Sequence, residues 1–159
     1  MTLDAGQPLP DFDLPTDGDG RLTKADLAGK AFVLYLYPKD DTSGCTKEAL
    51  AFQGLEAEFA ALGVTVIGLS KDGVKSHDKF KTKHGLGFPL LSDETGAFVE
   101  ALGAWVEKSM YGKKYMGIDR STFLVDANGT IAQVWRSVKV SGHAEAVLEA
   151  AKGLVKQAA

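Results

Sequence analysis

The chain has 159 residues, of which 45% are hydrophobic and 25% charged, with a formal net charge of -3 at pH 7. This composition predicts one folded domain over residues 1–159, with a core large enough to need no disulfide or metal. The weak negative charge argues against nucleic acids and anionic membranes as partners. The chain starts without the basic and apolar regions of a signal peptide, and no apolar run could span a membrane, so we expect a cytoplasmic protein.

Residues 1–30 are rich in turn-forming residues. The segment Asp17-Gly18-Asp19-Gly20 lies between two short partly apolar segments and predicts the loop of an N-terminal β-hairpin. A calcium loop is the alternative for this acidic turn, but it would need alternating oxygen ligands and a distal glutamate, which are missing. Residues 24–29 predict one short helical turn that ends at Gly29.

A strand, a helix and a second strand are predicted next. Residues 31–36 are apolar, with the β-branched and aromatic side chains of a buried strand. Residues 48–59 have apolar side chains at helical spacing, and residues 63–70 are typical of another buried strand. Because a strand, helix and strand of this length form a βαβ unit, we expect the two strands to pair in parallel.

The second half of the chain adds further helices and strands. In order, the patterns predict a helix over 74–84, an extended segment over 88–93, a helix capped at 92–95 that continues to Leu102, an irregular loop over 104–119, a strand over 121–126, a turn at 127–129, a strand over 130–136 and a helix over 142–157. This order predicts an α/β protein whose mixed central sheet has helices on both faces. A cysteine that follows a strand at the start of a helix resembles the way in which thioredoxin-like folds present their thiol.

Cys45 is the single cysteine of the chain. We expect it in the first turn of the helix, where free backbone N–H groups and the positive end of the helix dipole stabilise a thiolate. Many free cysteines are instead inert, buried and hydrophobic in character. The surrounding residues from Thr42 to Glu48 form no apolar shell, and this favours a reactive thiol.

The segment around this cysteine resembles a family signature. Pro38, Thr42 and Cys45 match the peroxiredoxin pattern of a proline, three residues, a threonine or serine, two residues and a cysteine. Residues 117–126 look like the peroxiredoxin strand that carries an arginine, and residues 108–116 are similar to the Q-type branch, also called bacterioferritin comigratory proteins. The resemblance extends over nearly the whole chain and implies a thioredoxin-like fold and a thiol-dependent peroxidase.

The resemblance implies a role for five residues. The thiolate of Cys45 would attack hydrogen peroxide or an organic hydroperoxide and become a sulfenic acid. Arg120 would stabilise the thiolate and donate hydrogen bonds to the peroxide, to which the Thr42 hydroxyl and the N–H groups of Gly44 and Cys45 would add. Pro38 would shield the sulfur from water. Taken singly, Arg120 could be a surface ion-pair partner, Thr42 a helix cap and Pro38 the end of a strand.

One departure from the family pattern concerns the resolving cysteine. Q-type proteins often carry it five positions after the peroxidatic cysteine, where this chain has Leu50, or on the next helix, where residues 74–84 have none. The sulfenic acid would therefore be reduced by an external thiol, from thioredoxin, glutaredoxin or glutathione. No cofactor or metal is expected, and a monomer is expected because Q-type relatives are frequently monomers. We expect Glu48 in the first turn of the helix, where a carboxylate interacts favourably with the helix dipole, and we expect it to orient an arginine as well.

Other classes of protein fit less well. A phosphatase loop would need an arginine where Ala51 stands, and a thioredoxin-type oxidoreductase would need a cysteine where Glu48 stands. The three histidines, His77, His84 and His143, lack the spacing of zinc ligands, and a cysteine hydrolase would need one of them beside the thiol. A peroxide sensor or chaperone on the same scaffold, with little turnover, remains the alternative function.

Overall fold

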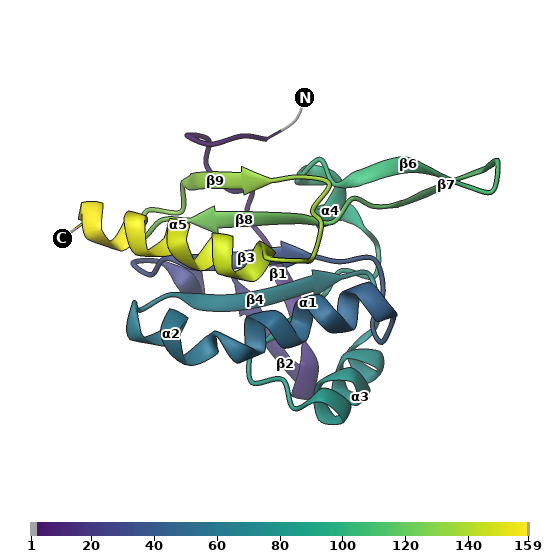
Figure 1. Cartoon of the computed structure of the whole chain (residues 1–159), viewed down its shortest axis with the longest axis horizontal. Coiled ribbons are helices and arrows are strands. Elements are labelled where there is room, and N and C mark those ends of the chain that lie inside the picture. Colours follow the sequence, from purple (N-terminus) through teal and green to yellow (C-terminus); the bar gives the residue numbers. More distant parts are fainter. Residues whose placement is uncertain (1–2, 159) are drawn as a thin grey trace.

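The computed structural model describes residues 3–158, and within them the main feature is a seven-stranded mixed sheet with the strand order β2-β1-β5-β4-β3-β8-β9 (Figure 1). The strands are β1 (Asp13–Thr16), β2 (Gly20–Thr23), β3 (Phe32–Leu36), β4 (Thr65–Ser70), β5 (Leu90–Ser92), β8 (Ser121–Val125) and β9 (Ile131–Trp135). The strands β3, β4 and β5 are parallel to one another, while β8 pairs antiparallel with β3 and with β9. The predicted mixed α/β architecture is confirmed.

The register of β3 places two distant segments of the chain at one edge of the sheet. Leu36, at the carboxyl end of β3, pairs with Leu69 of β4 and with Ser121 at the amino end of β8. The loop that follows β3 therefore lies beside Arg120, the residue that precedes β8. This pairing brings together residues more than seventy positions apart.

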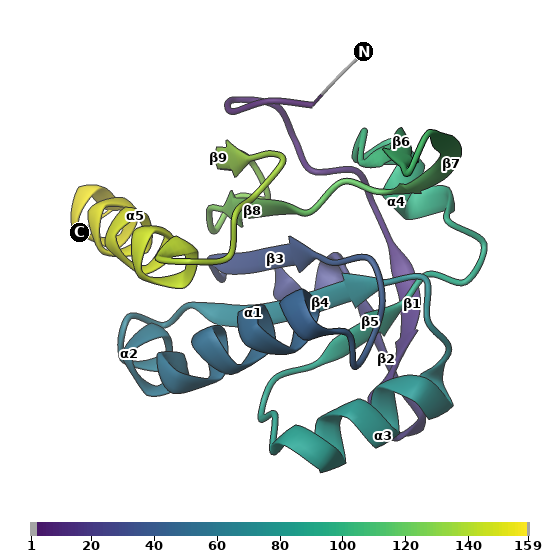
Figure 2. The ribbon, with the colours of Figure 1, turned by 45° about the vertical axis from the view of Figure 1, so that its right-hand side comes forward.

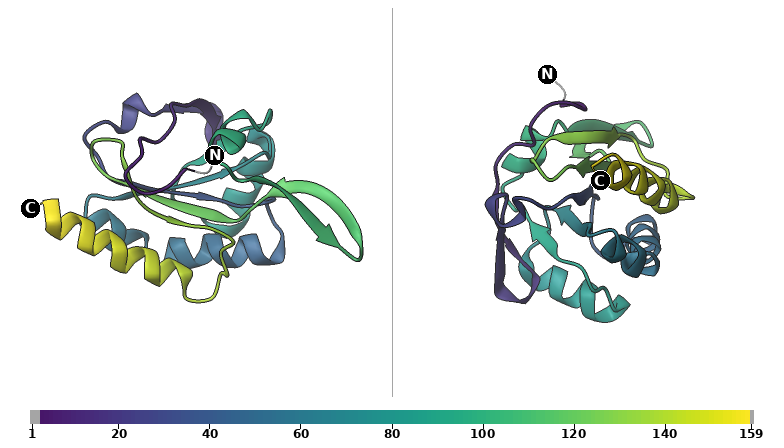
Figure 3. Two further views of the ribbon diagram at one scale, coloured as in Figure 1. Left: turned by 90° about the horizontal axis from the view of Figure 1, so that it is seen from above. Right: turned by 90° about the vertical axis from the view of Figure 1, so that its left-hand side faces the viewer.

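The two faces of β3 belong to two hydrophobic cores, because successive side chains of a strand point to opposite faces. Val33 and Tyr35 pack with α1 (Ser43–Gly54), α2 (Glu56–Ala61), α3 (Val74–His84) and α5 (His143–Ala158). Phe32, Leu34 and Leu36 pack with the short helix α4 (Ala97–Ala101), the 3-10 turn η2 (Ala25–Leu27) and the N-terminal segment. Figures 2 and 3 show the long helices on one side of the sheet and the N-terminal segment on the other. The prediction of helices on both faces is confirmed.

Most of the local predictions are confirmed as well. The Asp17–Gly20 region forms the loop of the β1–β2 hairpin, through the 3-10 turn η1 (Asp17–Asp19), and η2 is the helical turn predicted before Gly29. The helix predicted over 48–59 begins earlier, at Ser43, and Leu55 separates it into α1 and α2. None of the described helices combines the length and the apolarity that a membrane crossing requires.

The prediction of an irregular loop over 104–119 is wrong. These residues form a second antiparallel hairpin, with β6 (Trp105–Met110) and β7 (Lys113–Ile118), which projects from the body of the protein (Figure 1). Most side chains of this hairpin are exposed, so its strands lack the apolar alternation that identifies a half-buried strand. Its turn residues, Tyr111 and Gly112, both have positive φ (53° and 79°), yet tyrosine is not a residue typical of such a turn.

Candidate active site

Cys45 is the third residue of α1, directly above the carboxyl end of β3. The helix begins after Thr42, whose backbone is extended (φ -93°, ψ 159°) and whose carbonyl accepts the first helical hydrogen bond, from the N–H of Thr46 at 2.8 Å. The backbone N–H of Cys45 thus belongs to the first turn, where N–H groups have no partner within the helix. The placement of the thiol at the start of a helix is as the sequence predicted.

The sulfur of Cys45 is in direct contact with Arg120. The Nη2 atom of Arg120 lies 3.3 Å from Sγ, and the cysteine is 2% exposed. Gly44 makes this approach possible, because a side chain there would place its Cβ only 3.2 Å from Nη2. The glycine thus leaves room for the guanidinium beside the first turn of the helix.

The other side of the guanidinium is held by Glu48, one turn after the cysteine. Nη1 of Arg120 donates to Oε1 of Glu48 at 2.7 Å, and the glutamate is almost fully buried. Within residues 3–158, Oε2 of Glu48 has no hydrogen-bond partner. The expectation that Glu48 orients an arginine agrees with this contact, but its expected place in the first turn is wrong, because α1 begins at Ser43 and the first turn holds no acidic residue.

Burial and charge act in opposite directions on this pair. Burial raises the pKa of Glu48 to about 7, against the opposing charge and hydrogen bond of Arg120. Burial disfavours the charged form of Arg120, but the carboxylate of Glu48, the sulfur of Cys45 and the hydrogen bonds to both outweigh it, so the pKa of Arg120 is raised. The arginine thus keeps its positive charge beside the sulfur.

Thr42 and Pro38 lie on the loop between β3 and α1. The Thr42 hydroxyl donates to the carbonyl of Lys39 at 2.9 Å and does not cap the helix through its side chain. Its oxygen keeps lone pairs for a further donor. Pro38 is partly buried and directly follows Tyr37, a buried residue that extends the line of β3.

The described structure places the three histidines in separate environments. His84 pairs with Asp41 on the surface, and His143 lies against Thr122, with 2.8 Å between its Nε2 and the threonine hydroxyl. Burial, and then the charge of Arg120, lowers the pKa of His143 to about 4, so this imidazole is neutral at pH 7. His77 is fully buried and contacts Asp40, in the loop between β3 and α1. No zinc site formed by these three residues is therefore present among the described residues.

Sequence reasoning missed the environment of His77. Its Nδ1 atom lies 2.7 Å from Oδ2 of Asp40, a loop residue shortly before α1. The available signal was its position on the inner face of the helix, three residues before the buried Phe80. His77, Asp40 and Asp72 bring ligand-type atoms within 4.8 Å of one another, but both ring nitrogens of His77 already have hydrogen-bond partners. The group is therefore a hydrogen-bonded cluster and not an open metal site.

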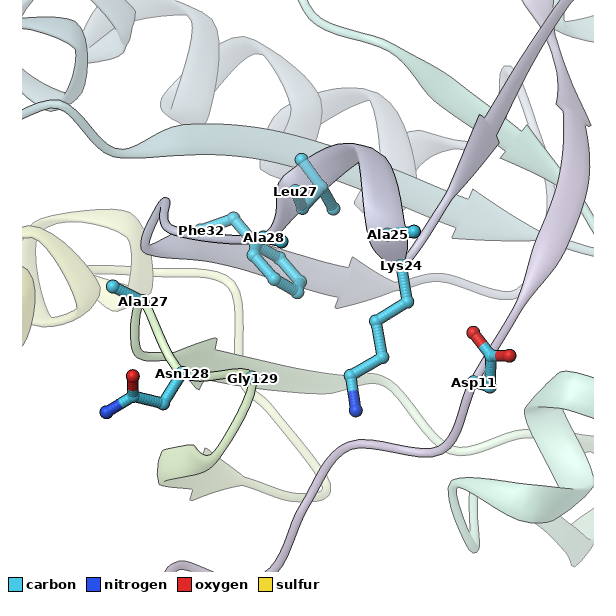
Figure 4. Close-up of a pocket in the computed structure, with 9 residues that line it drawn as sticks. All are labelled: Asp11, Lys24, Ala25, Leu27, Ala28, Phe32, Ala127, Asn128 and Gly129. Carbon is cyan, nitrogen blue, oxygen red and sulfur yellow. The ribbon is translucent and has the colours of Figure 1, made fainter.

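One hollow of the surface lies at the end of the sheet opposite to Cys45 (Figure 4). It has a volume of about 290 Å³ and is lined by Lys24, Phe32 and Asn128 among others. Phe32 is at the amino end of β3, whereas Cys45 follows the carboxyl end. A second hollow of about 300 Å³ lies between α3 and the loop that joins β3 to α1, and it includes Asp40 and Ser76.

Comparisons with known proteins identify the family of this chain. A model of the AhpC/TSA family matches residues 5–134. A putative peroxiredoxin bcp of Coxiella burnetii is 49% identical, with 93% of this chain and 98% of that protein covered, and peroxiredoxin Bcp of Bacillus subtilis is 44% identical, with 97% and 98% covered. A solved structure of the Xanthomonas campestris bacterioferritin comigratory protein, described by its alkyl peroxide reduction activity, has a TM-score of 0.90 and 46% identity, with 96% of this chain and 99% of that one covered.

The chain belongs to the AhpC/TSA family and is a peroxiredoxin, an enzyme of the thiol peroxidase class. Within this family it falls in the Q-type branch of bacterioferritin comigratory proteins. Its single cysteine means that it lacks a resolving cysteine.

Proposed function

We propose that Cys45 is the peroxidatic residue and that Arg120, Thr42, Gly44 and Pro38 form the site in which it reacts with hydrogen peroxide and organic hydroperoxides. The thiolate attacks one oxygen of the peroxide, an S–O bond forms and the O–O bond breaks. The sulfur is oxidised by two electrons to a sulfenic acid, and the departing oxygen takes a proton from water to leave as water or an alcohol. The observation that carries this proposal is the 3.3 Å contact between Arg120 and the sulfur.

Each of the other groups has a role that its position supports. Arg120 stabilises the thiolate and then the charge that develops on the leaving oxygen. The N–H groups of Gly44 and Cys45, free in the first turn of α1, donate to the attacked oxygen. The Thr42 hydroxyl accepts a hydrogen bond from the peroxide, and the ring of Pro38 limits the access of water to the sulfur.

The reductive half of the cycle uses an external thiol, because a second cysteine is missing from the chain. One thiol attacks the sulfenic sulfur, water leaves and a mixed disulfide forms. A second external thiol then attacks the mixed disulfide. Cys45 is released as a thiol, and the two external thiols leave joined by a disulfide. Thioredoxin, glutaredoxin and glutathione all supply this chemistry, and no cofactor is needed. We place this cycle in a single-domain, cytoplasmic monomer.

Peroxide consumption in the presence of a thiol reductant tests the proposal. We expect sustained, multiple-turnover consumption that is abolished by Cys45→Ser, together with mass spectra that show a sulfenic acid on Cys45 and a mixed disulfide with the competent reductant. A single stoichiometric oxidation followed by no turnover would contradict the proposal and favour the alternative, a peroxide sensor or chaperone that uses the same cysteine.

A further inference from the structure

The loop between β3 and α1, residues 37–42, which we call the catalytic loop, is anchored by a buried charged cluster. Asp40, in the loop between Pro38 and Thr42, lies against His77 of α3 with 2.7 Å between Oδ2 and Nδ1. The side chain of His77 is fully buried and that of Asp40 is 3% exposed. The peroxidase chemistry described above makes no use of either residue.

The hydrogen bonds of His77 define its charge. Nδ1 faces the carboxylate of Asp40, and Nε2 faces the backbone carbonyl of Leu91 at 2.8 Å. A neutral imidazole carries one N–H and can satisfy only one of these two acceptors, whereas the imidazolium satisfies both. The geometry therefore fits a buried imidazolium.

Asp40 is bonded as an ionised carboxylate should be. Its Oδ1 accepts from the Tyr37 hydroxyl at 2.5 Å, and its Oδ2 accepts from the Ser76 hydroxyl at 2.8 Å as well as from His77. Burial opposes the charge on His77, but the hydrogen bond and charge of Asp40, the Leu91 carbonyl and the charge of Asp72 outweigh it, and the pKa of His77 is raised. The titratable groups that face His77 are thus Asp40, Tyr37 and Asp72.

The cluster also holds the backbone of the loop. The N–H of Asp40 donates to Oδ2 of Asp72 at 2.8 Å, and Ser70 donates to the same oxygen at 2.7 Å. The next residue, Asp41, has a φ of 58°, a backbone conformation that is uncommon for residues other than glycine. A strained residue persists only where the surrounding structure fixes it, and the anchor lies immediately before it.

We propose that His77 is a positioning residue for the reaction of Cys45 with peroxide, because its imidazolium holds the catalytic loop through Asp40. The inference rests on the proposed function of Cys45. Since the loop carries Pro38 and Thr42 and leads into the helix start, a loosened loop misplaces the groups that surround the peroxide. Deprotonation of His77 removes the positive charge that pairs with Asp40 and leaves one N–H for two acceptors, Asp40 and Leu91, so the anchor is weakened.

The decisive experiment measures the second-order rate constant of reduced protein with hydrogen peroxide by competition with a second peroxidase, so that no external thiol is needed. We expect His77→Gln and Asp40→Asn each to lower this constant by roughly 10- to 100-fold, as a misplaced reacting group does. The double variant should be no slower than the slower single one, because both changes break one anchor. Lys83→Ala, at an exposed pair on the same loop and helix, is the matched control and should change the constant by less than about twofold.

Two measurements separate positioning from general damage to the fold. Ring-nitrogen NMR shifts of the wild type should show His77 as an imidazolium at pH 7, and a neutral ring there would overturn the inference even if no variant folds. The rate constant of the wild type should fall above the pH at which His77 loses its proton, and this fall should be missing in His77→Gln. If His77→Gln and Asp40→Asn fold and react with hydrogen peroxide at the wild-type rate, the role of His77 is refuted and the proposed function stands. If the wild-type protein does not react with hydrogen peroxide, the proposed function itself is refuted.

Discussion

Two ion pairs with buried carboxylates flank the start of α1, and they are built differently. In the first pair, Arg120 and Glu48, the arginine side chain is 16% exposed and also contacts the sulfur, and one carboxylate oxygen of Glu48 has no partner among the described residues. In the second pair, His77 and Asp40, both side chains are almost fully enclosed, and each faces a complete set of hydrogen-bond partners.

This difference indicates that the first pair is suited to contact a substrate and the second to support the loop between β3 and α1. Of the five N–H groups of Arg120, the contacts with Glu48 and Cys45 use two, so the proposed role leaves donors that can turn to a substrate as charge develops. A buried pair with every group satisfied gains nothing from a substrate but loses much when one partner is removed, because the other charge is left uncompensated. The first pair should therefore act on the reaction rate directly, and the second should act on it through stability and loop geometry.

Arg120→Met tests the first half of this comparison and should have the largest effect. We expect the rate constant of Cys45 with peroxide to fall by about 10²- to 10³-fold, the usual cost of removing one preorganised donor. The loss of stability should be moderate, because Glu48, whose pKa is already raised to about 7, can take up a proton. Peroxide competition and chemical denaturation measure the two quantities, with Arg21→Met at an exposed pair as the control. An unchanged rate constant would contradict the role of Arg120.

Isosteric amides at the two acids compare the pairs directly. Asp40→Asn should lower the free energy of unfolding at pH 7 by about 3 kcal/mol, because it leaves the buried charge of His77 without its counterion. Glu48→Gln should cost about 1 kcal/mol or less, because the amide oxygen still accepts from Arg120 and the buried carboxylate is removed. Urea denaturation of both variants gives the values, and equal losses would refute the distinction between the two pairs.

The pH dependence of stability should differ between the pairs. Glu48 has a pKa of about 7 in the folded protein, against an ordinary value of 4.5, so the folded state holds its proton to higher pH. Stability therefore falls between about pH 4.5 and 7, by on the order of 3 kcal/mol. The raised pKa of His77 stabilises the fold fully below its ordinary value of 6.5, and this stabilisation is lost as pH rises through the raised pKa. Unfolding curves from pH 4 to 9 should show the lower window disappear in Glu48→Gln; its persistence would contradict the assignment.

The smallest effect is expected at the exposed counterpart of these pairs. Lys83 contacts Asp41 at 2.8 Å, on the same loop and helix, but both side chains are largely exposed to water. Lys83→Ala should lower the free energy of unfolding by less than about 1 kcal/mol, and added salt should reduce the difference further. A loss as large as that of Asp40→Asn would show that burial does not distinguish these contacts.

Much of the fold and of the candidate site could be predicted from the sequence, for identifiable reasons. The strands of the main sheet are buried and apolar, and Cys45 stands in a motif whose residues are local to one loop. Arg120 was found through a second family segment, and the β3–β8 register explains why it reaches the sulfur. The β6–β7 hairpin was missed because its side chains are exposed, and its lack of apolar alternation left no periodic signal.

The anchor between Asp40 and His77 could not be predicted in the same way. The two residues are 37 positions apart, and neither belongs to a motif that indicates a partner. Their contact depends on how α3 packs over the end of β3, which is a property of the tertiary structure. The unpartnered oxygen of Glu48 is likewise visible only once the neighbours of the carboxylate are known.

The projecting hairpin has a consequence for the behaviour of the protein at high concentration. Within residues 3–158, β6 and β7 pair only with each other, so each presents a free row of backbone N–H and C=O groups, and Tyr111 at the tip is 98% exposed. Such edges are templates for strand addition by another chain, and lysines are a common means of preventing it. Lys113 and Lys114, both exposed on β7, place repelling charges along this edge. We therefore expect these lysines, of which Lys114 also contacts Glu107 of β6 at 3.6 Å, to hinder strand addition to the hairpin.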